Sequence, residues 1–475
     1  MHPCVKNVEY AVRGALPIRA EALSQQLKAD PSKVNFERVV FCNIGNPQQL
    51  NQKPITFFRQ VASLCENPEL LKAENRSIVS KLYPKDAIKR AELLTKNIGS
   101  IGAYSHSKGI AHIRENVAKF IEERDGYSVD PEHIFLTQGA SEGVQRVLQM
   151  LTQNEKSGIM IPIPQYPLYS ATLSLIDASP IPYYLDESSN WGLSRENLSK
   201  SVEQARANGV DVRALVIINP GNPTGQCLSE ENIRDIIDFC HNERIVLLAD
   251  EVYQTNIYQP EHRPFHSFKK ILRSMGPEYQ EQELFSFHST SKGMIGECGR
   301  RGGYFECTNI DAAVLDQLYK MASINLCPNV HGQIMVDLMT NPPVKGDESY
   351  PQYKAEYDAI YESLGRRATK LADSFNKLEG VTCNSAEGAM YLFPQIRLPA
   401  KAIEAAKQQN MTPDSYYALN MLEATGVCVI PGSGFGQEPN TYHFRSTFLP
   451  EEHLFEKFCG NLEKFHKEFM DKHRA

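Results

Sequence analysis

Residues 213–225 have the sequence RALVIINPGNPTG, in which an apolar run ends abruptly at asparagine, proline and glycine. A short run rich in β-branched residues and bounded by such breakers is typical of a strand buried on both faces of a sheet. The two Asn-Pro units and two glycines fix a tight loop, and the side chain of Asn222 offers hydrogen-bond donors at the strand end. A turn without a ligand would not need this pattern, so the stretch also indicates a binding site.

The same arrangement recurs elsewhere in the chain. Further apolar runs end at polar or glycine-rich residues at 134–136, 158–161, 245–249 and 284–287. Helical patterns lie between them, and 141–151 and 229–240 each carry apolar residues on one face. Strands that alternate with helices predict an α/β fold with a large, mostly parallel sheet flanked by helices. Ligands of such sheets bind outside the carboxyl ends of the strands, where this sequence carries its polar residues.

The last part of the chain has a different pattern. Residues 350–378 predict a long amphipathic helix, short strands are expected around 389–394 and 426–430, and 451–472 predict a closing helix. This pattern predicts a second, smaller α+β domain, joined by residues near the N-terminus. We therefore expect an N-terminal arm with part of the small domain at 1–72, a large ligand-binding domain at 73–330, and the rest of the small domain at 331–475.

The composition excludes several classes of protein. The 475 residues are 41% hydrophobic and 23% charged, which is ordinary for a soluble globular chain with a real core. The net charge of -7 argues against a nucleic-acid partner, and no apolar run approaches the roughly 20 residues of a membrane helix. No H-E-x-x-H motif or spaced Cys/His cluster indicates a metal.

Cysteine usage and the first residues bear on the compartment. The 11 cysteines include no C-x-x-C pair, which favours reduced thiols. Residues 1–5 lack the apolar segment of a secretory signal, and an Arg-rich transit segment is also absent. We therefore expect a cytoplasmic protein, with the mitochondrial matrix as the alternative.

Two charged residues stand directly behind predicted strands. Lys292 follows the run 284–287 in the string STSKG, and a lysine that loses hydration there can form an imine with an aldehyde. Asp250 ends the run 245–249, and a buried carboxylate needs a cationic or donor partner such as a protonated pyridine nitrogen. Taken one by one, a solvated loop lysine and a helix N-cap aspartate remain open as alternatives.

Residues 137–143, TQGASEG, combine a strand end, a turn of small residues and a helix start. The free backbone N–H groups, the helix dipole and the Ser141 hydroxyl suit a phosphate group. No lysine follows the glycines, so this is not a P-loop, and G-x-G-x-x-G is not matched either. Structural capping alone explains the pattern equally well.

In combination these features resemble the fold-type-I aminotransferases that use pyridoxal phosphate. The resemblance extends over nearly the whole chain and includes the branch of that family that acts on alanine. It rests on the strings VEYAVRG (8–14), IPIPQYPLY (161–169), HSTSKG (288–293), ECGRRGGY (297–304) and PGSGFG (431–436).

The resemblance implies roles for residues around the cofactor ring. Lys292 would bind the aldehyde of pyridoxal phosphate and then act as the base that moves a proton. Asp250 would pair with the pyridine nitrogen, while Asn222 and Tyr253 would hydrogen-bond the phenolic oxygen. Tyr166 would stack on the face of the ring.

The resemblance also assigns residues to the phosphate. Ala140 and Ser141 at the helix start would bind it together with Ser289 and one arginine. The family pattern places Arg301 in that role, and Arg300 is the alternative.

On the substrate side, Arg445, in the string YHFRS, matches the arginine that binds the α-carboxylate. A planar guanidinium with two parallel donors suits a carboxylate better than a lysine does. Gly45 matches the small residue beside the substrate, and Asn222 and Tyr166 would also face it. Tyr104 matches a tyrosine that reaches the phosphate from a neighbouring subunit, which implies a homodimer.

The implied activity is the transfer of the amino group of L-alanine to 2-oxoglutarate, giving pyruvate and L-glutamate. Small amino and oxo acids are then the partners, without nucleic acid, membrane or metal. The sequence identifies no residue that would bind the second carboxylate of glutamate. The alternatives are an aminotransferase with another donor, of aromatic or kynurenine type, and a homologue that binds pyridoxal phosphate without turnover. A nicotinamide-dependent dehydrogenase is disfavoured because its glycine motif is missing.

Overall fold

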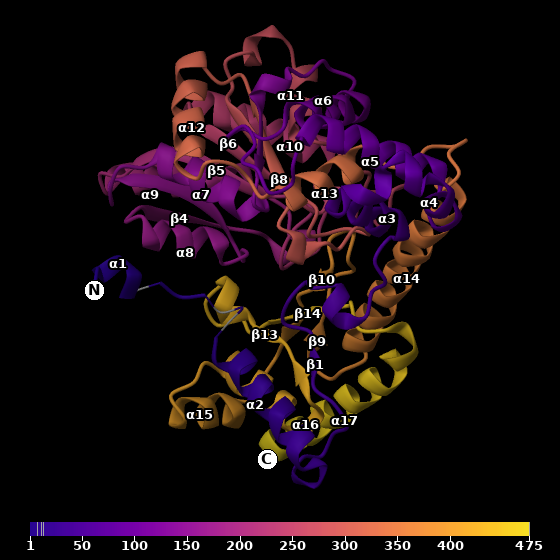
Figure 1. Ribbon diagram of the computed structural model, residues 1–475. Helices are drawn as coiled ribbons and strands as arrows, with labels where there is room; N and C mark the ends of the chain where they lie inside the picture. The colour runs from indigo at the N-terminus through magenta and orange to yellow at the C-terminus, as the bar shows by residue number, and fades with distance from the viewer. Residues whose placement is uncertain (7, 11, 13, 475) are drawn as a thin grey trace.

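The computed structural model describes residues 1–6, 8–10, 12 and 14–474. Two halves are apparent in Figure 1, the upper one built around a seven-stranded sheet and the lower one around several small sheets and the C-terminal helices. The string at 8–14, which contributes to the family resemblance, contains Ala11 and Arg13, and these two positions lie outside the described residues.

The large sheet confirms the predicted α/β class. Its strands run in the order β2-β8-β7-β6-β5-β3-β4. β8 is antiparallel to its neighbours β2 and β7, and the other neighbouring pairs are parallel. The strands are β2 (Ile134–Thr137), β3 (Ser157–Ile163), β4 (Ser179–Tyr184), β5 (Asp211–Ile218), β6 (Val246–Asp250), β7 (Leu284–Ser289) and β8 (Gly303–Thr308).

Helices cover both faces of this sheet. Along β5, Leu215 and Ile217 join one apolar cluster, while Val216 and Ile218 join the cluster on the opposite face. Because both faces are buried, the strand is apolar at consecutive positions, which accounts for the apolar run within residues 213–225. One face is covered by α9 (Arg195–Ala207), α10 (Glu230–Glu243) and α11 (Phe268–Ser274), and the other by α7 (Ala140–Leu151), α8 (Leu168–Leu175) and α12 (Ala312–Ile324).

A further helical layer lies beside β2. Its buried residues form a third apolar cluster with Ile134 and Leu136 of that strand. The helices of this layer are α3 (Thr56–Glu66), α4 (Arg76–Leu82), α5 (Lys85–Ile98), α6 (Ala111–Asp125) and α13 (Val330–Thr340).

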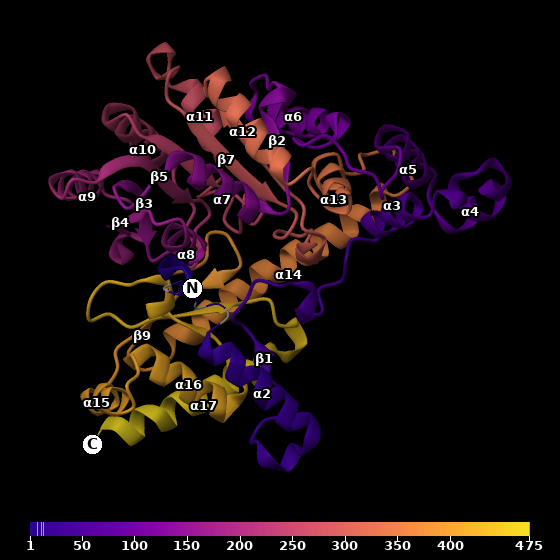
Figure 2. The same cartoon turned by 60° about the vertical axis from the view of Figure 1, so that its left-hand side comes forward.

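The smaller half combines segments from both ends of the chain. β1 (Val40–Phe41) pairs in parallel with β12 (Val427–Cys428), and α2 (Ala15–Ala29) packs against α16 (Pro413–Thr425) (Figure 2). The short α1 (Pro3–Lys6) contacts α8 of the larger half. The remaining elements are β9 (Val381–Thr382), β10 (Tyr391–Leu392), β11 (Gln395–Ile396), β13 (Ile430–Pro431), β14 (Phe444–Thr447), α15 (Ala400–Gln408) and α17 (Phe455–Arg474).

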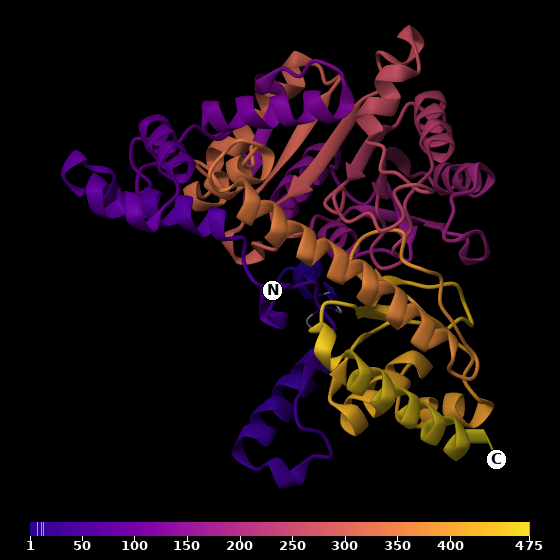
Figure 3. The same ribbon diagram turned by 90° about the vertical axis from the view of Figure 1, so that its right-hand side faces the viewer.

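The long helix α14 (Tyr350–Asn376) extends from one half to the other, as Figure 3 shows. Near its start, Glu356 accepts hydrogen bonds from the backbone N–H and hydroxyl of Thr56 in α3. Near its end, Leu371 and Phe375 are buried in the core of the smaller half. The domain boundaries expected at 72/73 and 330/331 stay predictions; α13, which begins at the second of them, packs against α6.

Three further observations concern the compartment and possible ligands. No helix within the described ranges is long and apolar enough to cross a membrane. All eleven cysteines are free thiols. Among residues 1–474, apart from the three undescribed positions, no group of three or more His, Cys, Asp or Glu is arranged to hold a metal ion.

Candidate active site

The loops behind β5, β6 and β7 bring three of the predicted residues together, Asn222, Tyr253 and Lys292. The Asn222 amide donates to the Tyr253 hydroxyl at 3.4 Å, and the Lys292 ammonium lies 5.8 Å from the centre of the Tyr253 ring. Lys292 Nζ also donates to the backbone carbonyl of Gly45 at 3.2 Å. A residue of the smaller half thus meets the strand ends of the larger half at the lysine.

Asp250 lies buried at the end of β6, beneath this group. The Tyr169 hydroxyl donates to its Oδ2 at 2.8 Å, and the backbone N–H of Val252 donates to Oδ1 at 3.4 Å. Burial raises the pKa of Asp250 above its ordinary value, although the bond from Tyr169 acts against this. No ion pair between described residues includes Asp250, so the carboxylate has capacity for a cationic partner.

The turn before α7 is joined to one of the two candidate arginines. Arg301 Nη2 donates to the Gln138 carbonyl at 3.0 Å and lies 3.3 Å from the Ser141 hydroxyl, and Nη1 lies 3.4 Å from the Ser291 hydroxyl. The first backbone N–H groups of α7, which begins at Ala140, have no helical partners and lie next to Arg301. The geometry favours Arg301 over Arg300 as the phosphate-binding arginine.

Ser289, the other residue predicted at the phosphate, closes the strand β7. Its hydroxyl donates to the Gly302 carbonyl at 3.2 Å and accepts from the Ser291 N–H at 3.0 Å. Gly303 then brings β8 against the turn: an added Cβ there would lie 2.7 Å from the Gly139 carbonyl carbon and 2.8 Å from the Ala140 nitrogen. The close approach of these two segments therefore requires glycine at 303.

Arg445, on β14, is almost completely buried, with 1% of its surface exposed. Nη1 donates to Asn222 Oδ1 at 2.9 Å, and Nη2 donates to the Asn43 carbonyl. The guanidinium carbon lies 4.2 Å from the Tyr391 ring centre and 4.7 Å from that of Phe435. Arg445 Nε has no hydrogen-bond partner among the described residues, so a donor remains for an anionic ligand.

Two predicted tyrosines occupy different environments. Tyr166 is partly buried, and its hydroxyl lies 2.5 Å from that of Tyr10 in the N-terminal segment. Burial, followed by the neighbouring Tyr10, raises the pKa of Tyr166 well above its ordinary value. Tyr104 is 78% exposed, and its side chain takes part in no hydrogen bond among the described residues. The structure therefore brings together the predicted residues except Tyr104.

Sequence reasoning missed several residues of this group. Tyr169 follows Tyr166 by three positions, and its buried hydroxyl could have been anticipated as a donor to a strand-end carboxylate. Tyr391 lies in an apolar string without a motif, and Phe435 lies in the string PGSGFG, which contributed to the resemblance but gave this ring no role. Asn43 acts through its backbone carbonyl, for which the side chain gives no signal.

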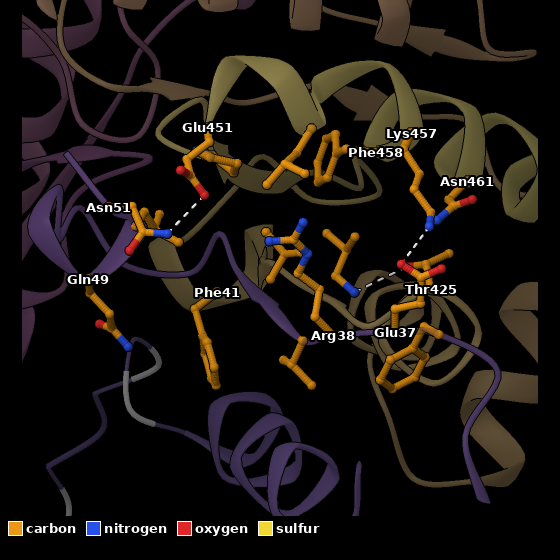
Figure 4. Close-up of a pocket in the computed structure, with 17 residues that line it drawn as sticks. Glu37, Arg38, Phe41, Gln49, Asn51, Thr425, Glu451, Lys457, Phe458 and Asn461 are labelled. Carbon is orange, nitrogen blue, oxygen red and sulfur yellow. Dashed lines mark hydrogen bonds and ion pairs between the residues drawn. The ribbon is translucent and has the colours of Figure 1, made fainter. Parts of the chain in front are cut away.

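A separate pocket of about 330 Å³ lies in the smaller half. Figure 4 shows it between the segment that leads into β1 and the start of α17. Ion pairing of Glu37 with Lys457 and a hydrogen bond from Asn51 to Glu451 mark its rim. None of the predicted site residues lines this pocket, so the grouped lysine, aspartate and arginines are not part of it.

The family is decided by comparison with known proteins. The sequence model described as aminotransferase class I and II matches residues 70–461. The chain belongs to the class I and II aminotransferases. This confirms the resemblance inferred from the strings at 8–14, 161–169, 288–293, 297–304 and 431–436.

Relatives of this aminotransferase are similar over nearly the whole of this chain. Alanine aminotransferase 2 of Panicum miliaceum is 54% identical, covering 100% of this chain and 98% of that protein. The mitochondrial alanine aminotransferase 2 of Arabidopsis thaliana is 52% identical, covering 100% and 87%. Glutamate–glyoxylate aminotransferase 2 of Arabidopsis thaliana is 54% identical, covering 99% and 95%. Among solved structures, the alanine aminotransferase of Pyrococcus furiosus has the same fold, with a TM-score of 0.76 at 20% identity, covering 98% and 100%.

Aminotransferases of this class depend on pyridoxal phosphate, and the described residues fit that group. The Arg301 guanidinium, beside the Ser141 hydroxyl and the N-terminus of α7, suits the phosphate. The buried Asp250, without an ion-pair partner, suits a protonated ring nitrogen. Lys292 supplies the primary amine beside them.

Proposed function

We propose that this aminotransferase transfers the amino group of L-alanine to 2-oxoglutarate, forming pyruvate and L-glutamate in two half-reactions. The observation that carries the proposal is the grouping of Lys292, Asp250 and Arg445 in one buried site, in a chain 52–54% identical to alanine aminotransferases. This identity favours alanine over an aromatic or kynurenine-type donor. The complete residue set favours turnover over binding alone.

The residues have distinct tasks in this proposal. Bound pyridoxal phosphate supplies an aldehyde for amines and an electron-withdrawing ring. Asp250 keeps the ring nitrogen protonated, and Asn222 and Tyr253 hydrogen-bond the phenolic oxygen. Lys292 Nζ would take the proton from the substrate α-carbon and hold it during the transfer.

Binding of substrate and phosphate uses other residues. Arg445 binds the α-carboxylate that every amino acid shares, with Gly45, Asn222 and Tyr166 around the substrate. Ala140, Ser141, Ser289 and Arg301 bind the phosphate. Tyr104 would complete that pocket from a second copy of the chain, so the active unit is a homodimer.

A second candidate is an aminotransferase that uses glyoxylate as amino acceptor. The glutamate–glyoxylate aminotransferase of Arabidopsis thaliana is 54% identical, as close as the alanine enzymes. The two candidates share the proposed roles of Lys292 and Arg445 but differ in the amino donor as well as in the oxo acid. Assays that pair alanine or glutamate with 2-oxoglutarate, pyruvate or glyoxylate separate them.

The compartment is proposed to be the cytoplasm or the mitochondrial matrix. Eleven free thiols are compatible with either reducing environment, and one of the relatives is named as mitochondrial. Fractionation of cells that express the full chain distinguishes the two.

The test is the visible spectrum of the purified protein loaded with pyridoxal phosphate. L-Alanine should bleach its yellow colour with release of pyruvate, and 2-oxoglutarate should restore the colour with release of L-glutamate. Lys292→Ala is the matched control and should show neither change while remaining folded. A protein that stays yellow with alanine but responds to another amino acid would have a different donor. One that responds to none would bind the cofactor without turnover.

A further inference from the structure

Tyr391 is a buried residue of the smaller half that faces both reactive cations of the site. It lies on β10, which pairs with β14, the strand that carries Arg445. Its exposed fraction is 1%, so the whole side chain is committed to contacts within the protein. No motif in the sequence singles it out, and the roles proposed above do not include it.

The ring of Tyr391 forms one wall of the Arg445 site. The guanidinium carbon lies 4.2 Å from its centre, and the ring of Phe435 contacts the same guanidinium at 4.7 Å. Aromatic faces attract a cation and leave its in-plane N–H groups free. The two rings therefore fix the plane of the guanidinium without consuming the donors that a carboxylate needs.

The hydroxyl of Tyr391 points to the lysine side. It accepts a hydrogen bond from the Tyr253 hydroxyl at 3.2 Å. A Cβ added to Gly45 would lie 2.1 Å from this hydroxyl and 3.3 Å from Lys292 Nζ, so both groups face the same point of the Gly45 backbone. Glycine at 45 is what allows the hydroxyl and the ammonium to meet there.

The electrostatics agree with this geometry. Burial would raise the pKa of Tyr391, but the charges of Lys292 and Arg445 and the hydrogen bond from Tyr253 outweigh it and lower the pKa. Tyr253, by contrast, has its pKa raised by burial and by Tyr391. Tyr391 is therefore the hydrogen-bond acceptor of the pair, and its oxygen is directed at the cations.

We propose that Tyr391 is a positioning residue that holds Arg445 through its ring and Lys292 through its hydroxyl. It thereby sets the separation between the amine that reacts and the guanidinium that binds the carboxylate. This inference rests on the proposed function, because it assumes that Lys292 and Arg445 have those tasks. Its two parts depend on different atoms of one side chain, so two substitutions separate them.

The experiment compares Tyr391→Phe, which removes only the hydroxyl, with Tyr391→Leu, which also removes the ring. Tyr417→Phe is the matched control, because Tyr417 is a buried tyrosine of the same apolar core whose hydroxyl contacts His466 instead. The first readout is the rate at which the cofactor-free chain captures pyridoxal phosphate at Lys292, measured by borohydride fixation and peptide mass spectrometry. The second is the Kd for propionate, which has the carboxylate of alanine but no amine, measured by absorbance of the loaded protein.

Tyr391→Phe should slow capture about fivefold, the effect of about one hydrogen bond, while its Kd for propionate stays at the wild-type value. Tyr391→Leu should slow capture equally and raise the propionate Kd about fivefold or more through loss of the cation–π contact. Tyr417→Phe should match the wild type in both. Phe435→Leu repeats the ring test from the opposite side if Tyr391→Leu does not fold.

Capture at the wild-type rate by Tyr391→Phe would overturn the role of the hydroxyl. An unchanged propionate Kd in the folded Tyr391→Leu protein, or in Phe435→Leu, would overturn the role of the ring. These outcomes differ from failure of the proposed function, in which the wild-type chain itself would not capture pyridoxal phosphate at Lys292.

Discussion

Arg445 is a charged residue whose surroundings explain why it stays charged and fixed while buried. Asn222 and Asn43 accept two of its hydrogen bonds, and two aromatic rings flank its plane. Aromatic rings contact the buried guanidinium, and its Nε has no hydrogen-bond partner among the described residues. This donor can therefore bind an anion. Its position across from Lys292 makes the α-carboxylate the anion that fits.

Replacement of Arg445 by alanine should lower kcat/KM for every amino acid alike. The loss should be about 100-fold, because about two charge-assisted hydrogen bonds to the shared carboxylate disappear. Steady-state kinetics with alanine and glutamate measure it. Arg366→Ala, which removes a surface arginine paired with Glu452, is the control and should be neutral. A defect confined to glutamate would show instead that Arg445 binds the side-chain carboxylate.

Among the elements, β8 combines a structural and a functional task. It is the antiparallel strand of the large sheet, and its first residue, Gly303, touches the turn before α7. The phosphate-binding turn is thus held in place by backbone contact with a neighbouring strand, and not by its own sequence alone.

Gly303→Ala should destabilise the protein by about 1–3 kcal/mol, because the new methyl group overlaps backbone atoms that cannot move freely. It should also weaken binding of pyridoxal phosphate by displacing Ala140. Gly460→Ala, in α17, meets no atom within 4 Å and should stabilise the chain by about 0.5–1 kcal/mol. Urea unfolding and cofactor titration provide the measurements. Equal stability of the two variants would contradict the close approach at 303.

The elements also show where sequence reasoning was sufficient. The central strands β5, β6 and β7 were predicted because each is an unbroken apolar run that ends in polar residues. β4 and β8 were not predicted. β4 contains Pro180 and Pro182 and lies at the sheet edge, where proline is tolerated, and β8 carries the charged Glu306, which is neutralised by Lys269.

The site likewise contains residues that the sequence identifies and residues that it does not. Lys292, Asp250 and Asn222 lie in strings that a strand–loop pattern and a family resemblance both identify. Tyr391 and Lys292 meet at Gly45 only because distant segments fold together, so the role of Tyr391 could not be predicted from periodicity or spacing. Asp250 and Tyr169 are likewise joined only in three dimensions.

For the molecule as a whole, the exposed Tyr104 is the observation that concerns assembly. Its side chain is 78% exposed, so it is available for contact with another surface. If it completes the phosphate pocket of a second copy, each site takes residues from two chains.

A mixture of two inactive variants tests this arrangement. Tyr104→Ala and Lys292→Ala should each be impaired as homodimers, whereas a mixed dimer contains one site with both native residues. Random mixing of equal amounts should restore about a quarter of wild-type activity, since half the dimers are mixed and half their sites are complete. The two variants are unfolded and refolded together, and transamination activity is then measured. No recovery, with dimers present by ultracentrifugation, would show that Tyr104 does not act between subunits.

Acid stability of the whole chain should depend on His288. Burial, followed by the charge of Arg124, lowers its pKa from 6.5 to about 3 in the folded state. Between these values the unfolded chain binds a proton that the folded chain does not, so stability is lost as the pH falls below 6.5. His288→Gln should remove up to about 1.4 kcal/mol of that loss per pH unit. Urea midpoints of both proteins between pH 7 and 5 measure the difference, and parallel pH profiles would exclude the effect.

Helix α14 gives the two halves a mechanical connection. Its 27 residues form a rod about 40 Å long, anchored to α3 at one end and to the core beneath β10 at the other. A rotation of about 5° around its middle would displace each end by nearly 2 Å, in opposite directions. A small rotation of α14 would therefore change the distance between Tyr391 in the smaller half and Lys292 in the larger half. The reach of the substrate site is therefore set by the stiffness of one helix as much as by the residues that line it.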